Sequence, residues 1–117
     1  MIPKINRLPG YKIPKLITSP IFLNSNFFVI KILETKSLEP PQIGFIVSTK
    51  ISKKAVIRNK IKRLLREAIK PHLKTFKKGQ NILIIARYPI VDKTLNQIKE
   101  NLKLRLRRLR TLRSSSS

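Results

Sequence analysis

The chain has 117 residues, of which 27 are Lys or Arg and only 5 are Asp or Glu, giving a formal net charge of +22. Its 41% hydrophobic content is enough for one domain with a modest core, but charge of one sign at this density repels itself unless a polyanion neutralises it. The lack of cysteine excludes a disulfide framework, a thiolate nucleophile and a zinc ribbon. No apolar run is long enough to span a membrane, and the first residues lack the apolar core of a secretory signal, so we expect a cytosolic protein.

The first part of the chain predicts one short helix and two strands. Prolines recur through the first 20 residues and rule out a long helix there, but Pro14 suits a first helical position and favours a short helix. The run Phe27–Leu33 is rich in aromatic and β-branched residues, which predicts a strand. The run Ile43–Thr49 predicts a second strand, with Phe45 and Val47 on one face.

The central stretch, Ala55 to Lys70, predicts an amphipathic helix that Ser52 caps and Pro71 ends. At about 100° per residue, one side of this helix is apolar: Ile57, Ile61, Leu64, Leu65 and Ala68. The opposite side and its borders are basic, and only Glu67 offsets the charge. Because a solvated face usually mixes both signs, this face favours a polyanionic partner.

The last part of the chain predicts one strand and one helix. The run Ile82–Ala86 is almost wholly apolar, which is typical of a strand buried on both faces. Thr94 and Gln97 have the spacing of a capping box at the start of a helix. Residues 114–117 are all serine and predict a disordered tail, so that the domain covers 1–113. The predicted fold class is a single α+β domain with a small mixed sheet and the order α-β-β-α-β-α.

The side chains available for chemistry do not form a catalytic or metal-binding pattern. The carboxylates are scattered and no two have a spacing suited to acid–base or two-metal chemistry. His72 is the only histidine, lies in a basic connection and is read as a solvated turn residue. We therefore predict no catalytic residue and no metal site on the protein alone, and expect another molecule to supply the chemistry.

One motif is specific enough to indicate a family. The run AVIRNKIKRLLREAIK, together with Gly44 to Ser48 and Lys50, resembles the signature of the bacterial ribonuclease P protein subunit. That family carries an Arg-Asn-Arg box, which reads Arg58-Asn59-Lys60 here, so charge is kept but the bidentate geometry of the third arginine is lost. The runs Pro3–Leu8 and Ile82–Pro89 also resemble the family.

The resemblance implies a function as the accessory subunit of an endoribonuclease. Family members bind ribonuclease P RNA, which with bound Mg²⁺ removes the 5′ leader from precursor tRNA. By this resemblance the RNA-binding residues are Lys50, Lys53, Lys54, Arg58, Asn59, Lys60, Lys62, Arg63 and Arg66. A cleft for the single-stranded leader would involve Phe45, with Leu16 and Ile17 standing where the family commonly carries aromatics. The expected partners are ribonuclease P RNA and precursor tRNA, with no membrane and no obligatory protein partner.

The resemblance also bears on the chain topology. A strand–helix–strand unit linking Ile43–Thr49 to Ile82–Ala86 predicts a parallel pair, which general rules make right-handed. The family instead has a left-handed crossover in a ribosomal protein S5 domain 2-like fold, so the resemblance implies the left-handed form.

Three other readings stay open on the sequence alone. The composition fits a ribosomal-type or generic basic RNA-binding protein equally well, and only the Arg58–Glu67 box separates that reading from the ribonuclease P protein family. A peripheral membrane-binding protein would use the Leu- and Arg-rich last helix, although core packing explains its apolar stripe more simply. A reader of double-stranded DNA would also present a basic helix, but the chain lacks helix-turn-helix spacing.

Overall fold

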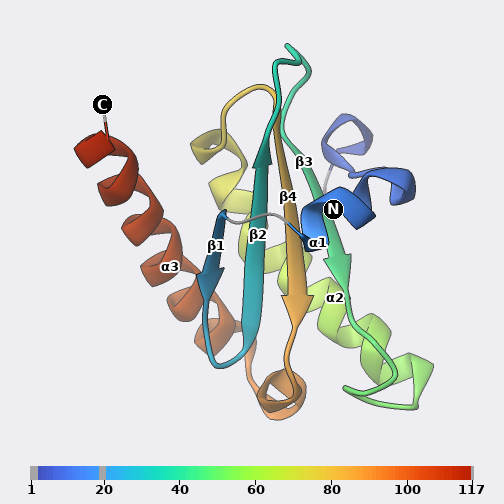
Figure 1. The fold of residues 1–117 in the computed structure, drawn as a ribbon. Coiled ribbons are helices and arrows are strands. Elements are labelled where there is room, and N and C mark those ends of the chain that lie inside the picture. The colour runs from blue at the N-terminus through green and yellow to red at the C-terminus, as the bar shows by residue number, and fades with distance from the viewer. Residues whose placement is uncertain (1–2, 19–20, 117) are drawn as a thin grey trace.

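The computed structural model describes residues 3–18 and 21–116, and describes side chains for residues 3–18 and 23–107. Its elements in chain order are α1 (Ile13–Ile17), β1 (Ile21–Asn24), β2 (Phe28–Glu34), β3 (Gln42–Ile46), α2 (Ala55–Ile69), β4 (Gln80–Ala86) and α3 (Leu95–Ser116) (Figure 1). Short 3₁₀ turns precede α1 and follow both α2 and β4.

The four strands form one mixed sheet in the order β1-β2-β4-β3. Strand β2 is antiparallel to both β1 and β4, whereas β3 is parallel to β4, as the strand–helix–strand unit predicted. The α+β class and the mixed sheet are therefore confirmed. The predicted order lacked β1, which pairs Ile21 with Ile32 and Asn24 with Val29 in a hairpin with β2. This strand has only four residues, so its own pattern is too short to identify it.

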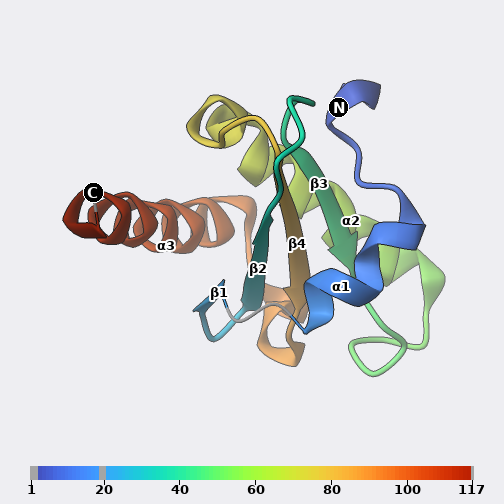
Figure 2. The ribbon, with the colours of Figure 1, turned by 45° about the horizontal axis from the view of Figure 1, so that its top comes forward.

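The crossover from β3 through α2 to β4 is left-handed. In Figure 1 both strands run downwards, β3 lies to the right of β4, and α2 runs behind the sheet. Figure 2 shows α2 on the same side of the sheet from a second direction. The expectation that came from the family resemblance is confirmed, and the right-handed form that general rules favour is absent from this unit.

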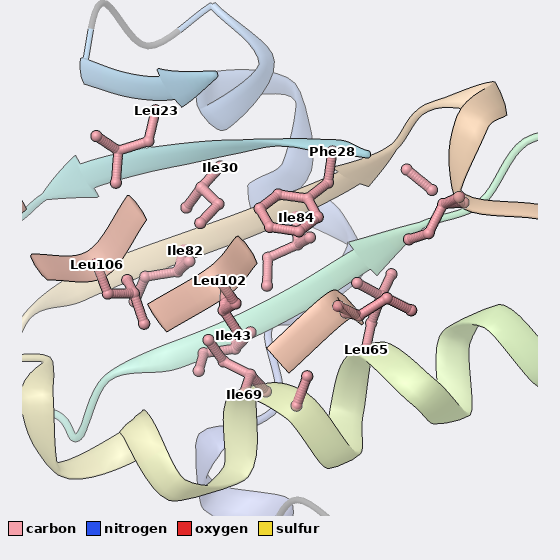
Figure 3. Close-up of a cluster of buried hydrophobic side chains, with 14 of the residues drawn as sticks. Leu23, Phe28, Ile30, Ile43, Leu65, Ile69, Ile82, Ile84, Leu102 and Leu106 are labelled. Carbon is pink, nitrogen blue, oxygen red and sulfur yellow. The ribbon is translucent and has the colours of Figure 1, made fainter. Parts of the chain in front are cut away.

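Helices α2 and α3 cover one face of the sheet and bury the main core. Figure 3 shows Ile30, Ile82 and Ile84 of the strands facing Leu65 of α2 and Leu102 of α3, all within one hydrophobic cluster. Helix α1 lies across the other face and contacts β2 and β4 (Figures 1 and 2). Strand β4 is thus covered on both sides, which confirms the prediction from its continuous apolar sequence.

The element ends show which local predictions hold. The short helix at Pro14 is confirmed as α1. The capping box is confirmed because the backbone N–H of Gln97 donates to Thr94 Oγ1 at 3.3 Å. The prediction of Ser52 as the α2 N-cap is wrong: Lys54 occupies that position in an extended conformation, and Ser52 Oγ instead accepts a hydrogen bond from the Lys54 amide at 3.2 Å.

Two predicted boundaries, the end of β3 and the end of α3, differ from the observed ones. The strand predicted over Ile43–Thr49 ends at Ile46, because a turn in which the Ile51 amide donates to the Ser48 carbonyl follows it. Helix α3 continues through Ser116, where the sequence predicts a disordered tail, and Ser117 lies outside the described residues. The domain bounds at 113 and 114 stay a prediction.

Candidate nucleic-acid interface

Helix α2 places its basic residues away from the core. Its buried residues Ile61, Leu65, Ala68 and Ile69 recur at helical intervals and face the sheet and α3. Ile57 and Leu64 pack against the same cluster from its rim. Burial of this stripe fixes the rotation of the helix, because turning it would expose the apolar side chains to water. The charged residues between them consequently point outwards.

The predicted RNA-binding residues lie in two groups along this outward side. Asn59, Lys60, Arg63 and Arg66 are exposed on α2. Lys50, Lys53 and Lys54 are exposed in the loop that leads into it. The nine predicted residues include two, Arg58 and Lys62, that are only half-exposed. The structure therefore brings the predicted set together as one surface, which we call the basic face of α2.

Arg58 has a structural contact in addition to its exposed portion. One terminal guanidinium nitrogen, Nη1, donates to the Ser52 carbonyl oxygen at 2.9 Å. The Ser52 hydroxyl oxygen in turn holds the Lys54 amide. Arg58 thus ties the first turn of α2 to the lysine-bearing loop and helps to fix the position of that loop. Its remaining donors stay available to a partner, because a guanidinium carries five N–H groups.

A cavity of about 420 Å³ opens beside the basic face, between α2, strand β3 and the N-terminal segment. It is lined by Arg7, Leu8, Ile43, Gly44, Phe45, Lys62 and Arg66. The guanidinium carbon of Arg66 lies 5.9 Å from the centre of the Phe45 ring, within the range of a cation–π contact. Phe45 therefore lies next to the basic face, and its predicted role in the leader cleft stays a prediction.

The other two residues predicted for the leader cleft lie elsewhere. Leu16 belongs to α1, which covers the face of the sheet opposite α2. It is 0% exposed, so it is buried in the core and does not line a cleft. Ile17 follows it on α1 and is 46% exposed. The structure does not gather Leu16, Ile17 and Phe45 in one cleft, because α1 and α2 cover different faces of the sheet.

A second cavity, of about 410 Å³, lies beside the start of α1. Its lining includes Tyr11, Lys12 and Lys15, together with residues of the β2–β3 loop and β4. Tyr11 is 79% exposed, so its ring is available for contact. The Lys12 ammonium donates to Gln42 Oε1 at 2.6 Å and lies 3.6 Å from a Glu39 carboxylate oxygen. This cavity unites cations with an exposed aromatic side chain.

Four lining residues were not predicted as site residues: Arg7, Leu8, Ile43 and Gly44. Arg7 is the one among them that carries a charge. It reaches the first cavity because it forms an isolated parallel bridge with Ile43, and the Leu8 amide donates to the Ile43 carbonyl at 3.0 Å. These pairings join residues some 35 positions apart, so local periodicity carries no signal for them. The only sequence signal at this position was the resemblance of Asn6-Arg7-Leu8 to the family's N-terminus.

The described residues lack two other kinds of feature, a metal-binding cluster and a membrane-spanning helix. No three of their His, Asp or Glu side chains are grouped so that they could hold a metal ion. None of the helices, over the described residues, has both the length and the apolar character needed to cross a membrane.

Comparison with known proteins gives consistent matches. The family model described as Ribonuclease P matches residues 11–110. A curated "Ribonuclease P protein component" from Bacillus velezensis is 36% identical over 90 residues, which cover 77% of this chain and 76% of that protein. The corresponding protein from Cyanothece is 40% identical over 67 residues, and the match spans about half of its length, 51%.

The solved structures extend the likeness to the fold. The Staphylococcus aureus RNase P protein at 2.0 Å superimposes with a TM-score of 0.75 at 31% sequence identity, covering 87% of this chain and 93% of that one. The residues that the family model matches, 11–110, include α2 and all four strands of the sheet.

Proposed function

The chain belongs to the ribonuclease P protein family, and from that premise we propose that it is the RNA-binding subunit that assists removal of the 5′ leader from precursor tRNA. The observation that carries this proposal is the basic face of α2, in which the family motif and the exposed cations coincide. Phosphate contacts of this kind supply most of the affinity of proteins for nucleic acids. In this proposal the catalytic groups belong to the RNA.

The basic face would bind ribonuclease P RNA. The cations of the basic face extend from Lys50 to Arg66, so several phosphates can contact it. The side-chain amide of Asn59 can both donate and accept a hydrogen bond. Magnesium would be held mainly by the RNA. The described residues have no grouping of carboxylates and histidine suited to a metal ion, so they do not fit a magnesium site made by the protein alone.

The leader of precursor tRNA would bind at the second cavity, beside Tyr11, in place of the cleft first expected at Leu16 and Ile17. Unpaired bases stack on exposed aromatic rings, and neighbouring cations contact the backbone phosphates. Tyr11 supplies the ring and Lys15 a neighbouring charge, both at the mouth of the same cavity. This placement also agrees with the family's use of aromatics near the first helix.

Replacing Tyr11 by Ala is expected to weaken the binding of precursor tRNA by about tenfold, since stacking on one aromatic contributes about 1–3 kcal/mol per base. The measurement is the dissociation constant of precursor tRNA from the complex of this protein with a bacterial ribonuclease P RNA. Mature tRNA, which lacks the leader, is the matched control and should bind the variant and the unmodified complex within about twofold. An equal loss for both tRNAs would contradict a leader contact at Tyr11.

A further inference from the structure

The cavity beside the basic face is lined by three cations from two separate parts of the chain. Arg7 comes from the N-terminal segment, and Lys62 and Arg66 come from α2. Among the described residues, those that line this cavity include no carboxylate. Three like charges around one opening repel one another, and an anion placed between them would remove that cost. The lining is therefore suited to an anionic group.

Phe45 contacts one of these cations. The Arg66 guanidinium lies over its ring, with 5.9 Å between the guanidinium carbon and the ring centre. A guanidinium carries five N–H donors, so a contact of Arg66 with the ring leaves donors for an anion. Two parallel N–H groups along one edge match two oxygens of a phosphate. Phe45 thus holds Arg66 while leaving its donors available.

Arg7 is fixed beside the cavity by its backbone. The bridge to Ile43 and the hydrogen bond from the Leu8 amide add the N-terminal segment to the edge of β3. The Asn6 side-chain amide also donates to the Pro41 carbonyl at 2.8 Å. Gly44 makes the approach feasible, because a Cβ atom there would lie 2.9 Å from Leu8 Cδ2. The segment is therefore packed closely on the sheet at the position of the cavity.

We propose that this cavity is a binding site for a backbone phosphate of RNA, with Arg7, Lys62 and Arg66 as the donors and Phe45 as the residue that positions Arg66. The proposal rests on the proposed function, and it extends the interface beyond α2 to the N-terminal segment and the edge of β3. A free phosphate ion has the same recognition chemistry, so the test includes both ligands.

The test is a titration of the ¹⁵N-labelled full chain, followed through the backbone amide signals of Gly44 and Phe45. The two probes are inorganic phosphate and a four-nucleotide RNA without a terminal phosphate, at constant ionic strength. Both probes should shift these signals, and the RNA should bind more tightly because neighbouring phosphates reach the rest of the basic face. Arg7→Ala should weaken RNA binding by about tenfold, as expected for loss of a charged hydrogen-bond donor.

Variants of Phe45 separate positioning from packing. Phe45→Leu should weaken binding by about threefold, the size of an exposed cation–π contact, while Phe45→Tyr keeps the ring and should stay within about twofold of the unmodified protein. Lys99→Ala, which removes the same charge from an exposed position on α3, is the matched control and should change binding by less than about twofold. Thermal unfolding of each variant establishes that it is folded.

Several results would overturn the proposal. Gly44 and Phe45 signals that do not move with either probe would contradict the site, and so would equal binding by Phe45→Leu and Phe45→Tyr at equal stability. Phosphate binding without RNA binding at these signals would make it a site for free anions instead. If the unmodified protein stimulates ribonuclease P RNA while the cavity binds neither probe, only this inference fails. If the cavity binds the RNA but there is no stimulation, the site holds and the proposed function fails.

Discussion

The triple variant Arg58→Ala, Arg63→Ala, Arg66→Ala is expected to bind ribonuclease P RNA about 100-fold more weakly than the unmodified protein. Each arginine is taken to contribute about 1 kcal/mol through phosphate contacts, and about 3 kcal/mol corresponds to roughly 100-fold in affinity. The measurement is the dissociation constant over a range of salt concentrations. If about six phosphates are engaged, the slope of log affinity against log salt should be near −5 for the unmodified protein and should lose about three units in the variant.

A matched variant controls for the loss of charge alone. Lys74→Ala, Lys78→Ala and Lys99→Ala together also remove three positive charges, from exposed positions outside the basic face of α2. This variant should keep most of the affinity. Arg58 also donates to the Ser52 carbonyl, so the thermal midpoint of the arginine variant must be measured alongside. Equal loss of RNA affinity in both triple variants would mean that the total charge, and not this face, determines binding.

Gly79→Ala is expected to lower the free energy of unfolding by about 3 kcal/mol, with a fall in the thermal midpoint of roughly 10 °C. Gly79 has a φ of 81°, a conformation that costs other residues about 1–2 kcal/mol. A Cβ atom there would also lie 2.6 Å from the Ser37 carbonyl oxygen and 2.7 Å from that of Thr35. Both are backbone atoms of the β2–β3 loop, so they have little freedom to move aside.

The backbone at Gly79 is also hydrogen-bonded to the β2–β3 loop. The Gly79 amide donates to the Glu39 carbonyl at 2.8 Å, and the Thr35 amide donates to the Gly79 carbonyl at 2.9 Å. Gly10→Ala is the matched control, because nothing lies within 4 Å of a Cβ atom at Gly10, and its effect should stay within about 0.5 kcal/mol. Equal unfolding midpoints for the two alanine variants would contradict the role given to the backbone at Gly79.

The elements that the sequence predicts well are those whose pattern is long and local. Helix α2 has fifteen residues of amphipathic sequence in which the buried positions Ile61 and Leu65 recur at helical spacing, so its face could be read directly. Strand β4 was predicted to be buried on both faces because its apolar run is nearly continuous. The motif in α2 also indicated the family, and through it the left-handed crossover.

The features that were missed depend on pairing between distant residues or on the position of a short element. Strand β1 is defined by its register with β2, and Arg7 by its bridge to Ile43. The resemblance to the family predicts Leu16 as a cleft residue, because the family commonly carries aromatics in this helix. Which side of α1 meets the sheet, however, depends on the tertiary packing. Ser52 was a plausible cap by residue type, yet the loop uses its hydroxyl within a turn before the helix begins.

The measurement that tests the central claim most directly is cleavage of a precursor tRNA by a bacterial ribonuclease P RNA at low magnesium, with and without this protein. The cleavage rate should rise when the unmodified protein is added and should stay at the level of RNA alone with the Arg58, Arg63 and Arg66 alanine variant. Tight binding of the unmodified protein to the RNA without any rise in cleavage would contradict the assignment as an accessory subunit and favour a generic RNA-binding protein.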